Sequence, residues 1–392
     1  MKTHTTMKTK LAVLILLLSN LAFGQIADPH AAFSSLKKSI ALSTGINLKY
    51  IDAGPRKGTP VILLHGYTDS GRSFQQAIDE LSASEPGFRL IVPDLRGHGA
   101  SSMPDSTQCA AMPEACFSMS AFASDIIALM DTLHIPQAHI VGHSMGNMIA
   151  QELVLRHAGR VSSLVLIGAF VNGKDAPAIR DFLIGEMLEK QWRSILEQRP
   201  GFRWPADAWS LTPRDLGPEV LDFLKQYWVV DPAADEAFVR AVYPETINTP
   251  LGLWIGAIKA LGQMDNRERI TNVKKPTLVL WATQDNFFPE IPDQQWVKQT
   301  FDLAAAANGT RVIYKTYGKT PLPASGMQES DLGHNLHWGA PAAVAADIAS
   351  FVKTGMPVNN HPYASPSNVK EVLSGEAVDN IAVRGKNALS ER

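Results

Sequence analysis

The sequence predicts an α/β protein: a mostly parallel central sheet with helices on both faces and an inserted helical cap. Three observations predict this class. Short apolar runs alternate with longer amphipathic segments, residues 171–270 have only helical patterns, and a glycine-flanked serine stands between one apolar run and the next helical one. Such alternation is typical of parallel sheets, because a crossover helix joins each pair of parallel strands.

Seven segments have the composition of buried strands, being rich in aliphatic and β-branched residues between turn residues. They cover residues 46–53, 61–65, 90–93, 138–141, 163–167, 277–281 and 311–315. A helix is expected before the fourth strand, because Phe122, Ile126, Met130 and Leu133 fall on one helical face. Ligands of parallel sheets bind at the carboxyl ends of the strands, so a site is expected in the loops that follow them.

The strand pattern stops between residues 171 and 270, where the sequence predicts helices over 176–197, 215–227, 234–242 and 250–262. This segment carries five of the eight tryptophans: Trp192, Trp204, Trp209, Trp228 and Trp254. Each one alone is expected to pack helices together, but as a group they favour an apolar cavity beneath a cap. We therefore expect a core formed by residues 25–170 and 271–355, with a helical cap over 171–270.

Ser144 is the candidate nucleophile. It is the serine of a G-x-S-x-G motif, directly after a predicted strand and before a helical segment, which is the setting of a nucleophile elbow. Such a turn is sharp, and the residues packed beside it must be almost free of side chain, as Gly142 and Gly146 are. Glycine-flanked serines also occur in plain turns, so the assignment depends on further segments.

Two later segments supply the groups that a serine nucleophile needs. A serine hydroxyl is activated by a base whose ring is oriented by a third group. His334, which follows a glycine, is the candidate base, and Asp285, in the loop after strand 277–281, is the candidate acid. The alternative base is His337. The alternative acids, Asp265 and Asp293, are both expected at the surface.

The segment His65-Gly66-Tyr67, at the end of strand 61–65, is expected to begin an oxyanion loop. Backbone N–H groups that face the developing negative charge of an acyl-transfer transition state stabilise it by about 3 kcal/mol per donor. The expected donors are the N–H groups of Tyr67 and Met145.

Four other polar residues near these motifs are expected to have structural roles. His98 and His143 are expected to be hydrogen-bonded side chains beside the site. Asp94 and Arg96 are expected to form an ion pair that fixes their loop.

Together these segments resemble the α/β-hydrolase family, in its cap-bearing serine hydrolase branch with esterase-like and lactonase-like members. The resemblance spans residues 47–353 and includes residues 65–67, Asp94 to Ser101, the elbow, Asp285 and the glycine-histidine pair at 333–334. It implies that Ser144, Asp285 and His334 form the family's catalytic triad. The branch often has glycine where Asn147 and Ala282 stand, and neither departure removes a catalytic group.

These residues and the resemblance predict a hydrolase that cleaves a carboxylic ester through an acyl-enzyme intermediate, with neither cofactor nor metal. The sequence has no H-E-x-x-H motif and no Cys/His ligand spacing. Lactonase, iminopeptidase, carbon–carbon bond hydrolase and perhydrolase activities are alternatives on this fold. The family's epoxide hydrolases and haloalkane dehalogenases use an aspartate nucleophile, so Ser144 argues against both. An alternative from another class is a noncatalytic ligand-binding protein.

Residues 1–24 predict a secretory signal peptide, with lysines before an apolar run over 11–18 and small residues at Ala22 and Gly24 before the cut. The run is shorter than the roughly 20 residues of a membrane span, so we expect a periplasmic or secreted protein without a stable membrane anchor. Removal of the signal peptide leaves 33 basic and 38 acidic residues, a net charge of −5. This charge does not favour nucleic acid as a partner. The expected partner is a small molecule, an apolar or aromatic ester.

Export changes the expectation for the two cysteines. In an oxidising compartment Cys109 and Cys116 are expected to form a disulfide, worth about 2–3 kcal/mol, that pins a loop near the pocket. Residues 356–392 are expected to form a polar tail with at most a short helix over 369–373.

Overall fold

The computed structural model describes residues 32–229, 231, 233–317, 332–358 and 370–373. The chain divides into two units, residues 1–36 and 37–392. The described part of the first unit contains the 3-10 helix Phe33–Leu36. The predicted signal peptide and most of the predicted tail lie outside the described residues.

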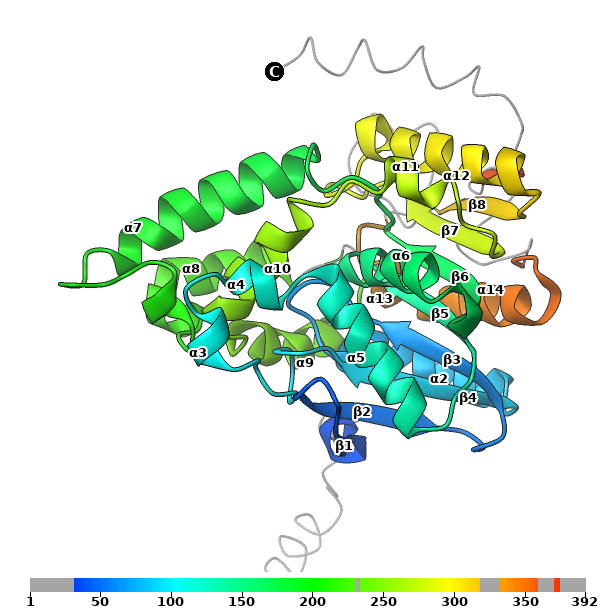
Figure 1. Ribbon diagram of the computed structural model, residues 1–392, viewed down its shortest axis with the longest axis horizontal. Coiled ribbons are helices and arrows are strands. Elements are labelled where there is room, and N and C mark those ends of the chain that lie inside the picture. Colours follow the sequence, from blue (N-terminus) through cyan, green and yellow to red (C-terminus); the bar gives the residue numbers. More distant parts are fainter. Residues whose placement is uncertain (1–31, 230, 232, 318–331, 359–369, 374–392) are drawn as a thin grey trace, which may run out of the picture. The chain divides into compact units, whose positions relative to one another are not determined.

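The second unit is built on a nine-stranded sheet of order β1-β2-β4-β3-β5-β6-β7-β8-β9 (Figure 1). Its strands are β1 Lys38–Ala41, β2 Asn47–Ala53, β3 Thr59–Leu64, β4 Phe88–Asp94, β5 Ala138–His143, β6 Val161–Ile167, β7 Thr277–Ala282, β8 Val312–Tyr317 and β9 Lys370–Leu373. In this order, the six neighbouring strands β4, β3, β5, β6, β7 and β8 pair in parallel. The pairs β1–β2, β2–β4 and β8–β9 are antiparallel. The predicted fold class is confirmed.

All seven predicted strands are present, with ends that differ by a few residues. The prediction of a short helix over 369–373 was wrong, because Lys370–Leu373 pairs with β8 as an edge strand. β1 was not predicted, since four residues with no fully buried position carry no alternation that sequence reasoning could detect.

Helices cover both faces of the sheet. α2 (Gln75–Ser84) packs against α14 (Pro341–Thr354) on one face, and α5 (Met119–Thr132) packs against α6 (Met145–Arg156) on the other (Figure 1). The central strand β5 is accordingly buried at five of its six residues.

One stretch of the described chain, Pro113–Thr132, has the length and hydropathy to cross a membrane. Half of its most apolar window is buried, and α5, which forms most of it, packs against α6. Core helices of soluble proteins have the same properties, so the stretch carries little weight as a membrane span.

Between β6 and β7 the described elements are helical. They are η4 Ala178–Trp192, α7 Arg193–Leu196, η5 Ala206–Ala208, η6 Pro213–Leu216, α8 Pro218–Phe223, η7 Leu224–Trp228, α9 Glu236–Ile247, α10 Leu251–Leu261 and α11 Arg267–Ile270. An isolated β-bridge joins Asn172 to Asp265 where this segment leaves and rejoins the core. We refer to residues 173–264 as the cap.

Candidate active site

Ser144 occupies a strained turn between β5 and α6, with φ 52° and ψ −118°. Residues with a Cβ atom seldom adopt a positive φ, so the surrounding structure must hold it. The Ser144 N–H donates to the Ile167 carbonyl oxygen at 3.0 Å. A Cβ atom on Gly142 would lie 2.4 Å from the Gly146 oxygen, and one on Gly146 would lie 2.1 Å from the Leu64 oxygen. Close backbone contacts therefore require both glycines of the motif.

Asn147, which stands where the family often has glycine, stabilises this turn. Its side-chain N–H group donates to the carbonyl oxygens of Ser144, at 2.5 Å, and Gly168, at 3.3 Å. Its oxygen accepts from Gln151 at 2.9 Å, and Gln151 in turn accepts from Asn266 at 3.0 Å. This chain of hydrogen bonds joins the elbow to the segment that follows the cap. All three amide side chains are fully buried.

The structure brings the predicted base and acid together. His334 Nδ1 lies 3.0 Å from Asp285 Oδ2. The other oxygen of Asp285 accepts the N–H groups of Phe287 and Phe288, each at 2.9 Å. The carboxylate is thus fixed in one orientation, in which it favours the His334 tautomer with a proton on Nδ1.

Ser144, His334 and Tyr67 line one cavity of about 50 Å³. Its other walls are mainly apolar and include Phe170, Ile179, Leu183, Trp228, Ile258, Leu261, Phe287 and Phe288. Within the part of the chain that the structure describes, neither the Tyr67 N–H nor the Met145 N–H has a hydrogen-bond acceptor. No acceptor among the described residues therefore competes for either predicted oxyanion donor.

A second cavity, of about 430 Å³, adjoins the first. Both are lined by Trp228, Phe287, His334 and Asn335. The second cavity is more polar than the first, because Asp231 and Gln284 line only the second one. Phe182 and Tyr227 also line only the second cavity.

The alternative base, His337, lies in the core rather than at the serine. Its Nε2 atom is 2.9 Å from Ser73 Oγ, and its ring packs against Phe74 with centroids 4.6 Å apart. Burial, followed by the effect of His334, lowers the pKa of His337 to about 3, so the ring is neutral.

The two alternative acids differ in position. Asp265 is exposed and pairs with Arg267, as expected for a surface residue. The prediction of a surface position for Asp293 was wrong, because this side chain is 1% exposed. Among the described residues neither of its carboxyl oxygens has a hydrogen-bond partner. Burial and the charge of Asp285 raise the pKa of Asp293 to about 7.

Asp69 lines the cavity of Ser144 and was not singled out from the sequence. Its Oδ2 atom accepts from Ser73 Oγ at 3.0 Å and lies 3.8 Å from His143 Nδ1. Burial raises the pKa of Asp69 to about 7. The available signal was its position, two residues after the predicted oxyanion donor Tyr67.

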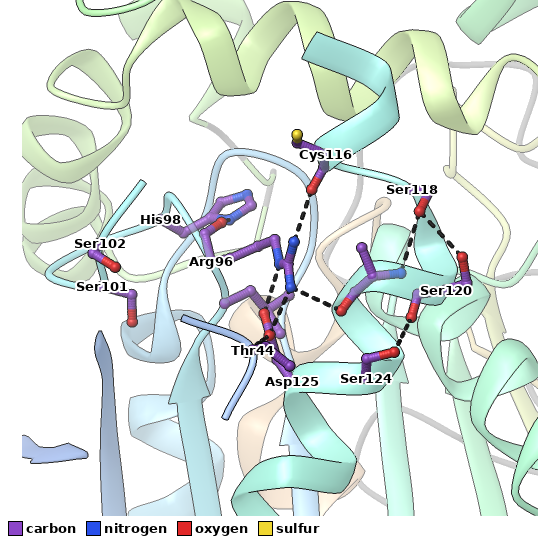
Figure 2. Close-up of polar contacts among 12 residues, drawn as sticks. Thr44, Arg96, His98, Ser101, Ser102, Cys116, Ser118, Ser120, Ser124 and Asp125 are labelled. Carbon is purple, nitrogen blue, oxygen red and sulfur yellow. Dashed lines mark hydrogen bonds and ion pairs between the residues drawn. The ribbon is translucent and has the colours of Figure 1, made fainter. Parts of the chain in front are cut away.

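The predicted ion pair between Asp94 and Arg96 is wrong. Arg96 instead forms a bidentate pair with Asp125, with Nε–Oδ2 and Nη2–Oδ1 distances of 2.6 Å (Figure 2). Asp94 pairs with Lys37, whose Nζ lies 2.8 Å from Oδ2. Asp94 is the last residue of β4, whereas Arg96 lies in the turn that the His98 N–H closes on the Leu95 carbonyl oxygen at 2.9 Å, so their side chains meet different elements.

The predicted disulfide between Cys109 and Cys116 is present. It joins the ends of two short helices, α3 (Ser106–Cys109) and α4 (Pro113–Cys116). Arg96 donates to the Cys116 carbonyl oxygen at 2.9 Å, as Figure 2 shows, and α4 packs against the cap helix α10. The disulfide loop is therefore fixed between the core and the cap.

Comparisons with known proteins show the family and the fold. Residues 59–302 match the family described as alpha/beta hydrolase fold. The putative carbamate hydrolase RutD of Variovorax paradoxus (strain S110) is 30% identical over 244 residues, 62% of this chain and 80% of that protein. The 2-hydroxymuconate semialdehyde hydrolase of Pseudomonas sp. (strain CF600) is 28% identical over 233 residues, 53% of this chain and 73% of that protein. The solved esterase RhEst1 of Rhodococcus sp. ECU1013 shares the fold, with a TM-score of 0.55 at 20% identity over 81% of this chain and 99% of that one.

Proposed function

Because this chain belongs to the α/β-hydrolase family, we propose that it is a serine hydrolase that cleaves carboxylic esters through an acyl-enzyme intermediate. One observation carries the proposal. The strained Ser144 shares a cavity with His334, whose Nδ1 atom is hydrogen-bonded to Asp285. A nucleophile, a base and an orienting acid are the three parts that such a reaction needs.

In the proposed reaction Ser144 Oγ attacks the ester carbonyl carbon while Nε2 of His334 accepts the hydroxyl proton. Asp285 holds the ring and stabilises its protonated form. The oxyanion of the tetrahedral intermediate binds the N–H groups of Tyr67 and Met145. The alcohol leaves with the proton from His334, and a water molecule, deprotonated by the same ring, releases the acid.

The proposed substrate is an apolar or aromatic ester. The mainly apolar wall of the inner cavity supports an apolar group beside Ser144, and the larger adjoining cavity offers room for a second group. The relative named as a putative carbamate hydrolase adds carbamates to the alternative substrates. Lactones and carbon–carbon bonds stay alternatives because the family resemblance implies them. A ligand-binding protein without catalysis is the alternative from another class.

We also propose that the protein is exported after cleavage of a signal peptide near Gly24. The lysine-flanked apolar run of residues 1–24 and the Cys109–Cys116 disulfide support this, because disulfides persist mainly in oxidising compartments. N-terminal sequencing of the protein recovered from the periplasm or medium tests it. A retained Met1 on protein confined to the cytoplasm would contradict export.

A panel of substrates tests the proposed activity. Purified protein is assayed on p-nitrophenyl esters from acetate to palmitate, beside lactones, carbamates and amino-acid amides. We expect the highest kcat/KM on an ester with an apolar acyl group. Turnover of lactones or carbamates alone would contradict the ester assignment, and turnover of none of them would favour a binding protein.

A further inference from the structure

The oxyanion loop, residues 66–72, is bonded to three different elements of the cap. This loop carries the Tyr67 N–H, which the proposed function assigns to the substrate oxyanion. Its first contact is made by the Tyr67 side chain, whose hydroxyl donates to the Trp254 carbonyl oxygen in α10 at 2.5 Å. The tyrosine ring also packs edge-to-face on the Trp254 ring, with centroids 5.3 Å apart.

The second contact holds the backbone next to the oxyanion donor. Thr68 has φ 64°, a left-handed conformation that is strongly disfavoured for a β-branched residue. Its Oγ1 atom accepts the indole N–H of Trp228, in η7 of the cap, at 2.9 Å. The Tyr67–Thr68 peptide, which this φ orients, is joined through the Tyr67 Cα atom to the Gly66–Tyr67 peptide that carries the donor N–H. Relaxation of Thr68 would therefore shift the Tyr67 backbone and the donor with it.

The third contact joins the end of the loop to α9. Glu245 bonds to Ser70 Oγ, and its Oε1 atom lies 2.6 Å from Arg72 Nε. The Arg72 and Glu245 side chains are only 6% and 21% exposed, so solvent screens this pair weakly. Asp94 also holds this end from the core, through the Gly71 N–H at 2.9 Å.

We propose that the cap positions the oxyanion loop, with Trp228 as the positioning residue that holds Thr68 in its left-handed conformation. The inference rests on the proposed function and adds a structural role for the cap beyond lining the cavity. The side-chain bonds of Tyr67 and Thr68 go to the cap, whereas the core bonds the loop further on, at Asp69 through Ser73 and at Gly71 through Asp94. The contacts that dock the cap on the core therefore also place the Tyr67 N–H.

Thr68→Val is the most direct test, because valine keeps the shape and β-branching but removes the acceptor for Trp228. Thr68 is not among the described residues that line either cavity, so the substitution replaces no side chain of the cavity walls. Loss of one oxyanion donor lowers kcat by about 100- to 1000-fold, and a displaced donor loses part of that. We expect a roughly 10- to 100-fold lower kcat, with KM changed by less than about threefold.

Three further variants separate positioning from folding. Thr68→Ser keeps the hydroxyl and is expected to keep kcat within about threefold of wild type. Trp228→Phe removes the indole N–H and is expected to lower kcat like Thr68→Val. The double variant is expected to be no slower than the slower single variant, because both changes break the same bond.

Glu245→Gln provides an independent variant, since it keeps the side-chain shape and weakens the bond to Arg72. It is expected to lower kcat by a smaller factor, because Asp94 still holds Gly71. Trp204→Phe is the matched control. This half-buried cap tryptophan faces Glu189 within the cap, and kcat is expected to stay at the wild-type value.

Rates of the variants that keep Ser144 are measured per mole of active sites, titrated with a fluorophosphonate, and the rate of Ser144→Ala is measured per mole of folded protein. All are measured well below the melting temperature. A wild-type kcat in Thr68→Val and Glu245→Gln would overturn this inference alone if Ser144→Ala is inactive. Additive losses in the double variant would overturn it too, since Trp228 would then act only as a cavity wall. Full activity in Ser144→Ala would overturn the proposed function and this inference with it.

Discussion

His143 Nε2 lies 3.0 Å from the carbonyl oxygen of His334. Burial holds the pKa of His143 well below its ordinary value, so the ring is neutral and Nε2 donates its proton to that oxygen. The residue directly before the proposed nucleophile therefore fixes the backbone of the proposed base. The expected structural role of His143 has this specific form: it joins the end of β5 to the loop of His334, 191 residues further along the chain.

Asp285→Asn tests which carboxylate orients the base. Asparagine keeps the shape but favours the wrong imidazole tautomer, so we expect kcat to fall by about 10⁴-fold. Asp293→Asn is the matched control, and its kcat is expected to stay within a few-fold of wild type. A large loss with Asp293→Asn and a small one with Asp285→Asn would assign the acid to Asp293.

Asp293 is expected to make stability depend on pH. The fold raises its pKa from 3.8 to about 7, so the stability associated with the neutral form is fully present below pH 4 and is lost as pH rises through 7. Asp293→Asn is expected to raise the free energy of unfolding more at pH 8 than at pH 5, measured by urea denaturation. The exposed Asp222→Asn is the control. An equal effect of Asp293→Asn at both pH values would contradict a raised pKa for the buried Asp293 carboxyl.

The Cys109–Cys116 disulfide closes a short loop, with a sequence separation of 7. Loop-closure entropy for this length predicts that Cys109→Ser combined with Cys116→Ser lowers the free energy of unfolding by about 2–3 kcal/mol. Urea denaturation measures the change, and reduction of the wild-type protein is expected to give a similar shift. A transition unaffected by either treatment would refute a stabilising disulfide.

Arg96→Lys is expected to destabilise the fold more than the same change at the surface. A lysine ammonium cannot replace the planar guanidinium of Arg96, which donates to Asp125 and the Cys116 carbonyl oxygen (Figure 2). The same guanidinium also donates to the Ala121 carbonyl oxygen. We expect a loss of about 2–3 kcal/mol, because Asp125 is almost fully buried.

Arg180→Lys provides the comparison for this variant. Arg180 forms a bidentate pair with Asp181 on the surface, and its replacement is expected to leave the free energy of unfolding close to the wild-type value. The free energy of unfolding is measured by urea denaturation. Equal decreases in the two variants would show that the Arg96 contacts stabilise the fold no more than a surface ion pair does.

The strands and the candidate site residues could be proposed from the sequence because their signals are local. Each predicted strand is a mostly apolar run, and Ser144 owes its backbone conformation to glycines two residues away on each side. Asp285 and His334 were recognisable because each follows a local pattern, a strand in one case and a glycine in the other.

The remaining features depend on neighbours distant in the chain. Arg96 meets Asp125, 29 residues away, and no spacing rule selects that partner over Asp94. The burial of Asp293 and the position of Asp69 in the cavity follow from packing between loops. The contacts of Thr68 with Trp228 likewise join residues 160 positions apart, which a single sequence does not connect.

Labelling with a fluorophosphonate, followed by peptide mapping, tests the central claim most directly, because only an activated serine reacts rapidly. We predict one phosphonyl group per chain, located on Ser144, and loss of both labelling and about 10⁶-fold in kcat in Ser144→Ala. The exposed Ser124→Ala is expected to label and turn over like wild type. Label on another residue, or none on a protein that still hydrolyses esters, would contradict the account.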